Sequence, residues 1–177
     1  MKKILLTGFT GIFLLLVTGI AASGQLASDN VQPSGDFDPF GNTFSKNAPV
    51  DRNSVNARVV KNFVRSYKNV FNEQWYKLQD GFVSLFNLDD IDYQVAYDKK
   101  GNWIRTIRSY GESKLSGDAR HMIRSIYYDC RINLVQEIEN PDDPVTYVVQ
   151  LKGKTQIINL MIRDGEMTVL KKYARSE

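Results

Sequence analysis

The side chains best suited to nucleophilic chemistry are scarce. The chain has one cysteine, Cys130, and one histidine, His121. A thiol and an imidazole can act as nucleophile and base only within hydrogen-bond reach. Nine positions separate them on a stretch with helical periodicity, which is about 13 Å at 1.5 Å rise per residue. This spacing argues against direct contact, and a lone histidine without clustered thiols does not match a zinc site.

Carboxylates are the other candidates for chemistry. Asp89, Asp90 and Asp92 form the densest group. A calcium loop needs ligands at regular alternate positions and an internal glycine, and neither is present. Paired aspartates after an apolar run are typical of a turn, and Asp142-Asp143 between two prolines is interpreted likewise. The sequence also lacks the GxSxG, P-loop and HExxH motifs. We therefore predict no catalytic residue, no metal and no cofactor, with an enzyme as the lesser alternative.

Aromatic side chains give the best binding signal. A polar-tipped aromatic on an open sheet face is a typical binding anchor. Alternation sends about half of the residues of a strand into the core, so packing is the alternative for each of them. In the pair Trp75-Tyr76 only one residue can face the core, and we predict Trp75 inward and Tyr76 outward. The candidate binding residues are Tyr76, Tyr93, Tyr97, Trp103 and Tyr147.

The N-terminus predicts export. Lys2 and Lys3 precede an uncharged apolar run at 4–20, and small residues follow up to Gly24. This is the layout of a secretory signal peptide, residues 1–24. A membrane anchor is the alternative, since about 17 apolar residues can barely span a bilayer. We expect a periplasmic or secreted protein without a membrane span after cleavage.

The charge of the mature chain is nearly balanced. Lys2 and Lys3 leave with the signal, so 21 of the 23 basic side chains remain against 20 acidic ones. This balance does not favour nucleic acid as a partner. Cys130 has no partner within the chain, which excludes a disulfide framework. We expect a buried, inert thiol and a monomer, with a mixed disulfide or covalent dimer as the alternative.

Residues 25–52 have the composition of a flexible linker. Within them, Phe37, Phe40 and Phe44 recur among turn residues in DFDPFGNTF. They are either scattered aromatics of a linker or a short motif that docks on the domain itself or on a partner. Residues 53–177 are long enough for one domain with its own core.

Periodicity within the domain predicts one plan used twice, over 53–111 and 112–177. Each half has a helix followed by four strands, and several apolar positions recur at an offset of about 60. We predict an α+β fold in which two tandem units of one helix and four antiparallel strands form one continuous sheet, with both helices on one face. Asp80-Gly81 is predicted as the first hairpin turn. The first predicted helix is 55–69, with Asn53-Ser54 as its N-cap, and the second is 118–130. The predicted strands are 70–78, 82–88, 91–97, 103–109, 131–139, 145–151, 155–163 and 166–173.

The order of these motifs resembles a known family. They are VVKNF-x3-Y, W-x5-G-F-x3-F and YQVAYDKKGNW, followed by a second helix and the weaker copy ending NLMIRDGEMTVL. The chain is similar over about residues 53–173 to secreted bacterial proteins called PepSY-like or β-lactamase-inhibitor-like. The chain departs from the family at Ser116, where a proline often opens the second helix. Val135 replaces a second tryptophan, which weakens an aromatic platform in the second copy.

The resemblance implies an envelope or extracellular binding protein without catalysis, and relatives of this fold use an aromatic-rich concave sheet to occlude an enzyme's active site. We therefore expect a protein or peptide partner on the open sheet face, with inhibition as one form of such binding. Two alternatives remain open. One is a binder of small ligands or cell-wall components, with a pocket between sheet and helix. The other is a structural or envelope-stress protein.

Overall fold

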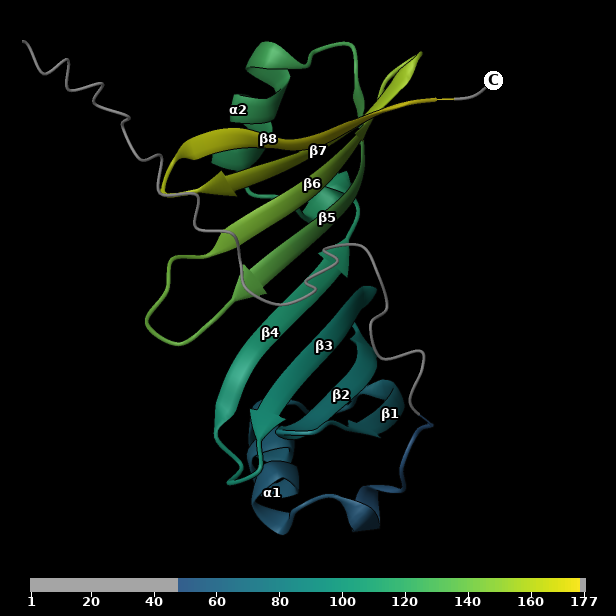
Figure 1. The fold of residues 1–177 in the computed structure, drawn as a ribbon, viewed down its shortest axis with the longest axis vertical. Coiled ribbons are helices and arrows are strands. Elements are labelled where there is room, and N and C mark those ends of the chain that lie inside the picture. Colours follow the sequence, from purple (N-terminus) through teal and green to yellow (C-terminus); the bar gives the residue numbers. More distant parts are fainter. Residues whose placement is uncertain (1–47, 176–177) are drawn as a thin grey trace, which may run out of the picture. The chain divides into compact units, whose positions relative to one another are not determined.

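The computed structural model describes residues 48–175. The predicted signal peptide and the segment 37–44 lie outside the described residues. The fold is mostly β, with eight strands and two α-helices in the part described, and it follows the predicted order of elements (Figure 1). The elements are a 3-10 turn η1 (Arg52–Ser54), α1 (Ala57–Ser66), β1 (Phe71–Lys77), β2 (Gly81–Leu88), β3 (Ile91–Asp98), β4 (Trp103–Tyr110), a 3-10 turn η2 (Glu112–Lys114), α2 (Gly117–Ile126), β5 (Arg131–Glu139), β6 (Thr146–Lys152), β7 (Gln156–Arg163) and β8 (Glu166–Ala174).

Helix α1 is shorter than predicted at both ends. Its N-cap is Asn56, whose side chain accepts a hydrogen bond from the backbone N–H of Arg58. The expected cap region at residues 53–54 instead belongs to η1, which Asp51 caps. Tyr67 already has extended backbone angles, and Asn69 has a positive φ of 55°. The apolar repeat continues past the helix because Tyr67 still packs against the core as part of the connection to β1.

Helix α2 begins at a serine cap. The Ser116 side chain accepts a hydrogen bond from the backbone N–H of Ala119, so the serine caps the helix without the proline that is common in the family. The predicted helix reached Cys130 and was too long, since α2 ends at Ile126. Cys130 is buried beside the start of β5.

All eight strands form one sheet in chain order, and every neighbouring pair is antiparallel. The two halves join through β4 and β5, where Thr106 lies opposite Glu139 and Tyr110 opposite Val135. Asp89-Asp90 is a turn as predicted, and both residues have positive φ angles of 52° and 59°. Such angles match the right-handed twist of a two-residue hairpin.

Gly81 does not form the first turn, contrary to prediction. The turn is Leu78 to Asp80, and Gly81 is the first residue of β2, opposite Asp98. A Cβ at Gly81 would collide with the carbonyl oxygen of Tyr97. The glycine is thus required by a close approach of two strands and not by the turn angle.

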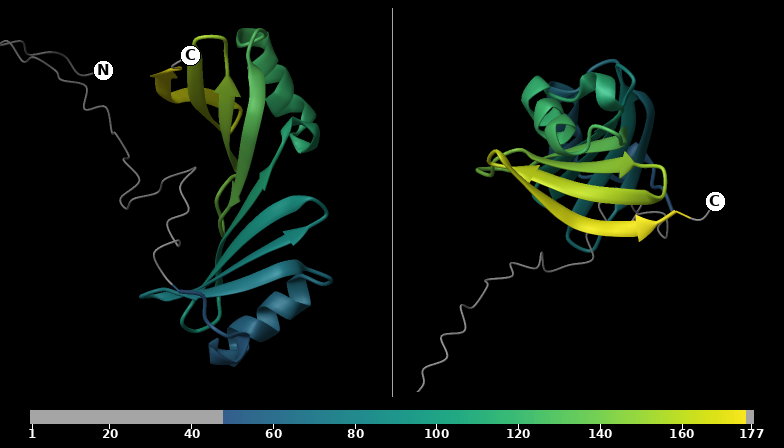
Figure 2. Two further views of the ribbon diagram at one scale, coloured as in Figure 1. Left: turned by 90° about the vertical axis from the view of Figure 1, so that its right-hand side faces the viewer. Right: turned by 90° about the horizontal axis from the view of Figure 1, so that it is seen from above.

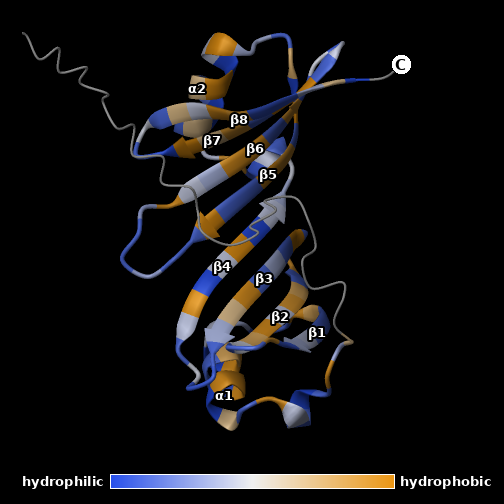
Figure 3. Ribbon diagram, viewed as in Figure 1, coloured by the Kyte–Doolittle hydropathy of each residue, from blue (hydrophilic) through white to orange (hydrophobic). Residues whose placement is uncertain are grey.

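Two core clusters lie under the two helices. Under α1, Val59 and Phe63 pack against a group that includes Trp75, and under α2, Ala119 and Ile123 pack against a group that includes Val135. Alternation and register place both clusters on the same face of the sheet, and Figure 2 shows each helix against its own half. Figure 3 shows the alternation as hydrophobic and hydrophilic bands along the strands. We call the opposite face of the sheet the open face.

A polar cluster joins the halves on the helix-covered face. The Arg108 guanidinium on β4 lies 2.7 Å from carboxylate oxygens of both Glu137 and Glu139 on β5. The Tyr110 hydroxyl donates a hydrogen bond to Glu137. The ion pairs thus cross the one strand pair that holds the two halves together.

Candidate binding surface

The open face is built from alternate residues of the strands, and the register aligns them in four rows across the sheet. The rows are Tyr76, Val83, Ala96 and Arg105; Gln74, Leu85, Gln94, Ile107, Ile138 and Thr146; Asn87, Asp92, Ser109, Gln136, Val148 and Met161; and Leu134, Gln150, Asn159 and Lys171. The face therefore combines aliphatic side chains with many side-chain amides.

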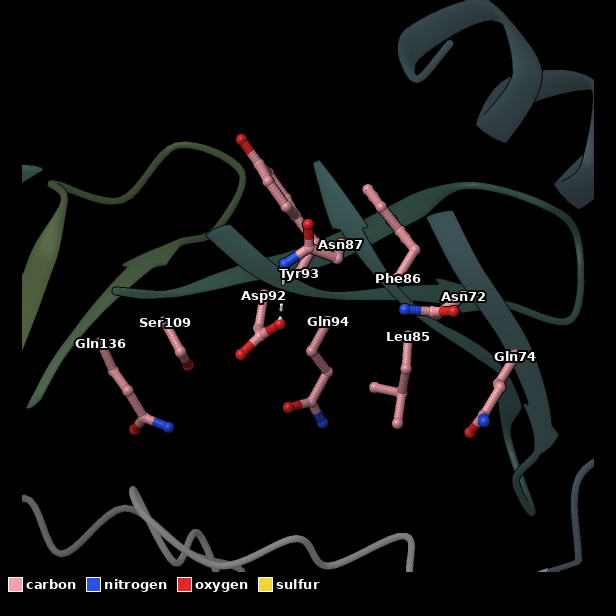
Figure 4. A pocket seen from close by; sticks show the side chains of 10 residues that line it. All are labelled: Asn72, Gln74, Leu85, Phe86, Asn87, Asp92, Tyr93, Gln94, Ser109 and Gln136. Atoms are coloured by element: carbon pink, nitrogen blue, oxygen red, sulfur yellow. Dashed lines mark hydrogen bonds between the residues drawn. The ribbon is translucent and has the colours of Figure 1, made fainter. Parts of the chain in front are cut away.

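A depression of about 400 Å³ lies on this face, over β1 to β5. Figure 4 shows Gln74, Leu85, Gln94 and Gln136 pointing to the same side of the sheet. Tyr93 also borders the depression, but its ring points to the other side. The floor of the depression thus combines amides, a leucine, the Ser109 hydroxyl and the Asp92 carboxylate, contributed by different strands.

Four aliphatic side chains of the open face are buried. Val83 has 0% of its surface exposed, and Ile107, Ile138 and Val148 form a separate small cluster. No helix or strand among the described residues lies over this cluster, since both helices pack on the opposite face. These side chains are therefore the strongest apolar feature of the open face.

Two amide oxygens on this face lack partners. Gln136 Oε1 and Asn159 Oδ1 are buried atoms, and neither accepts a hydrogen bond from any described residue. A buried polar atom without a partner costs about 1–3 kcal/mol. Both oxygens are acceptors, so an N–H or O–H donor placed over this part of the face would satisfy them.

The predicted binding residues fall on both faces. Tyr76 lies on the open face as predicted, with its hydroxyl donating to Gln74 Oε1 at 2.8 Å. Trp75 packs in the core, also as predicted. The placement of the other four candidates on the open face was wrong. They lie on the helix-covered face, within or against the core clusters, and are Tyr93, Tyr97, Trp103 and Tyr147.

Aromatic packing under α1 explains this placement. The ring of Phe63 lies 5.1 Å from that of Trp75 and 5.2 Å from that of Phe86, and Tyr93 stacks on Phe86 at 5.0 Å. Burying large aromatic area against the helix decides which side of β3 faces inward. Tyr97 is only 3% exposed, and burial raises the pKa of its hydroxyl. The expected aromatic platform is thus the core of the first half.

Solved structures share this fold, whereas the known protein families and the curated proteins give no match to the chain. A BLIP-like protein from Bacteroides fragilis is 17% identical, with a TM-score of 0.55, over 68% of this chain and 86% of its own. A DUF2874 family protein from Bacteroides ovatus is 16% identical, with a TM-score of 0.56, over 68% and 88%. A candidate periplasmic protein from Bacteroides eggerthii is 13% identical, with a TM-score of 0.55, over 68% and 88%.

The chain has the BLIP-like fold. This is consistent with the resemblance to β-lactamase-inhibitor-like proteins that the sequence motifs indicated. At these identities the likeness concerns the fold alone. What this chain binds must therefore be argued from its own open face.

The amides of the open face were not predicted, although the sequence carried a signal for them. Along β3, Asp92, Gln94 and Ala96 alternate with the aromatic set. Once the aromatic set is assigned to the core, this polar set must face away from the helices. Gln136 gave no comparable signal, because its side depends on the register between β4 and β5.

The residues considered for chemistry are dispersed in this BLIP-like fold. Cys130 is buried, and burial, with the nearby Asp129, raises the pKa of its thiol. His121 is exposed on α2. In the part of the chain that the structure describes, no three side chains of His, Cys, Asp or Glu lie close enough together to hold a metal ion. No helix of that part is long and apolar enough to cross a membrane.

A second depression, of about 460 Å³, lies at the end of α1 and against β1. Phe63 and Tyr67 contribute apolar surface to it, and Arg52 and Glu73 contribute charge. Arg52 and Glu73 form an ion pair of 3.5 Å there. The predicted alternative of a pocket between sheet and helix corresponds to this place.

Proposed function

We propose that this protein is a periplasmic or secreted, non-catalytic binding module that engages a protein or peptide partner through the open face. The N-terminal signal pattern supports export, and a neighbour of the same fold is described as a candidate periplasmic protein. The BLIP-like neighbour supports a binding role over catalysis. Inhibition of an enzyme is one outcome that such binding would have.

One observation carries the proposal: the open face offers buried aliphatic side chains next to amide oxygens that lack donors. A polypeptide presents one backbone N–H per non-proline residue together with side chains that need burial. Such a chain would cover Ile107, Ile138 and Val148 and donate hydrogen bonds to Gln136 and Asn159. The depression extends over β1 to β5, which is long enough for a peptide or a protein loop to lie in it.

A peptide-binding experiment tests this proposal. Random peptides displayed on phage are selected on the immobilised mature protein, and enriched peptides are synthesised and their binding is mapped by amide NMR. We expect shifts centred on Gln94, Ser109 and Gln136. The variant Gln136→Arg should weaken binding at least tenfold, because it removes the acceptor amide and fills the depression with a longer, charged side chain. Ser125→Arg on the exposed face of α2 is the matched control and should leave affinity unchanged.

Two results would contradict the proposal. Peptides that bind with equal affinity to the Gln136→Arg variant would remove the open face as the site. A thermal-shift response to small cell-wall fragments, together with no peptide binding, would favour the small-ligand alternative at the depression between α1 and β1. Tyr97→Ala is unsuitable for this test because Tyr97 is a core residue whose loss would destabilise the fold.

We also propose that the halves 53–111 and 112–177 are copies of one helix-plus-four-strand unit. Trp75 and Val135 support this, since each is a buried residue of the first strand after its helix and they are 60 positions apart. Asn56 and Ser116 are likewise N-caps at an offset of 60.

A further inference from the structure

Part of the open face is deeply buried. Val83 lies between Tyr76 on β1 and Ala96 on β3, yet its side chain is fully buried. Asn159 is 6% exposed, although it also lies on this face. An antiparallel sheet can leave one face in water, and no helix or strand of the described part lies over these side chains, so a further group has room to cover them.

The described chain begins beside this face. The backbone N–H of Val50 donates to the carbonyl oxygen of Trp75 at 2.8 Å, so Val50 lies along the outer edge of β1. The described chain thus begins near the β1 edge of the sheet, two residues before Val50. Eleven extended residues, the length of 37–47, reach about 36 Å. The five strand spacings from β1 to β6 amount to about 24 Å.

The chemistry of the preceding segment fits the face. DFDPFGNTF carries Phe37, Phe40 and Phe44, at spacings of three and four residues. Their rings would bury apolar surface against the cluster of Ile107, Ile138 and Val148. The backbone N–H groups of the segment are donors of the kind that Gln136 Oε1 and Asn159 Oδ1 lack.

We propose that residues 37–44 of this chain dock on the open face of the same molecule. The occupant is the chain's own segment because that segment is covalently tethered at the border of the face and needs no outside partner to reach it. Docking there would also make the segment a competitor of an outside partner. This competition rests on the proposed function, whereas docking itself does not.

Methyl NMR of the mature protein tests the docking without any partner. Aromatic rings shift the methyl signals of the side chains they cover, so the triple substitution Phe37→Ala, Phe40→Ala and Phe44→Ala should move the methyl signals of Val83, Ile107, Ile138 and Val148. The methyl signals of Ile123 on α2 and of Ile158 on β7, which belong to the core cluster of the other face, should stay in place. Tyr128→Ala, at a side chain that is 80% exposed, is the control for loss of an aromatic ring.

A synthetic peptide of residues 35–46 provides the second arm. Added to the triple variant, it should restore the original signals of the open face, which separates docking from any change in folding. Unmoved open-face signals in the triple variant would overturn the proposal. Signals in the unsubstituted protein that change with protein concentration would overturn it too, since the occupant would then be the segment of a second copy. Because no outside partner is present, neither result bears on the proposed function.

Discussion

The ion pairs of Arg108 cross from β4 to β5, and their contribution to the stability of the fold can be measured. Arg108 lies 2.7 Å from both Glu137 and Glu139, and the side-chain exposures are 24%, 22% and 38%. Breaking a fully buried pair costs about 3–5 kcal/mol, and an exposed pair contributes about 0–1 kcal/mol. With roughly three quarters of Arg108 and Glu137 shielded, we expect Arg108→Met to lower the free energy of unfolding by about 2–3 kcal/mol.

A double-mutant cycle separates the ion pair from packing. Glu137→Gln keeps the shape of the side chain and removes its charge, so the double variant should lose less than the two single variants added together. We expect a coupling of about 1–2 kcal/mol, within the range for residues in one network. Urea unfolding supplies the free energies. Far-UV circular dichroism follows both halves, and fluorescence follows Trp75 and Trp103, which both belong to the α1 half.

Arg163→Met is the matched control. Arg163 pairs with Asp143 at 3.2 Å, but both side chains are 45% exposed. Its loss should cost less than about 1 kcal/mol. The reasoning would be refuted if Arg108→Met and Arg163→Met lowered the free energy of unfolding equally. It would also be refuted if the effects of Arg108→Met and Glu137→Gln were additive, because burial of the pair would then contribute nothing.

Three other predictions concern the core. Ser84→Ala should raise the free energy of unfolding by about 1 kcal/mol in urea titrations, because Ser84 Oγ is buried without a partner among the described residues. Thr106→Val should lower the free energy of unfolding, because Thr106 Oγ1 accepts a hydrogen bond from Trp103 Nε1 at 2.9 Å. Burial raises the pKa of Tyr97 in the folded state, so the contribution of this group to stability should be constant below about pH 10 and fall above it, by up to about 1.4 kcal/mol per pH unit. Tyr97→Phe should reduce that slope, and an unchanged slope would contradict this cause. Ellman's reagent should label Cys130 slowly in the native protein and rapidly in denaturant, since the thiol is buried and its pKa is raised.

Secondary structure was largely predictable because each element has its own period. Strand ends agree with the alternation to within about one residue, as in β5, where predicted and observed bounds coincide. Helix ends were not predictable from the apolar repeat. Tyr67 keeps the spacing of α1 and packs in the core after the helix has ended, so burial alone does not mark the end of a helix.

The side on which the aromatics lie was the main error, and it has a physical cause. Alternation separates Tyr93 and Tyr97 from Gln94 but does not say which set the helix covers. That choice depends on Phe63 of α1, which joins the core cluster of Trp75 and the β3 tyrosines only once α1 is packed on the sheet. Gly81 was assigned to the turn for a similar reason, since the close approach of the Tyr97 carbonyl is a tertiary contact.

The two edges of the sheet favour binding through its face over addition of a strand. A peptide that adds a strand needs a free row of backbone groups at an edge. At β1 the Val50 backbone already pairs with Trp75. At β8 the edge strand carries Lys171 and Lys172, and charged lysines on an edge oppose pairing with another strand. The open face has the opposite character, with aliphatic side chains and two unsatisfied amide oxygens. A polypeptide would therefore gain more by lying across the strands than by extending the sheet, whether it is the chain's own segment 37–44 or part of a partner.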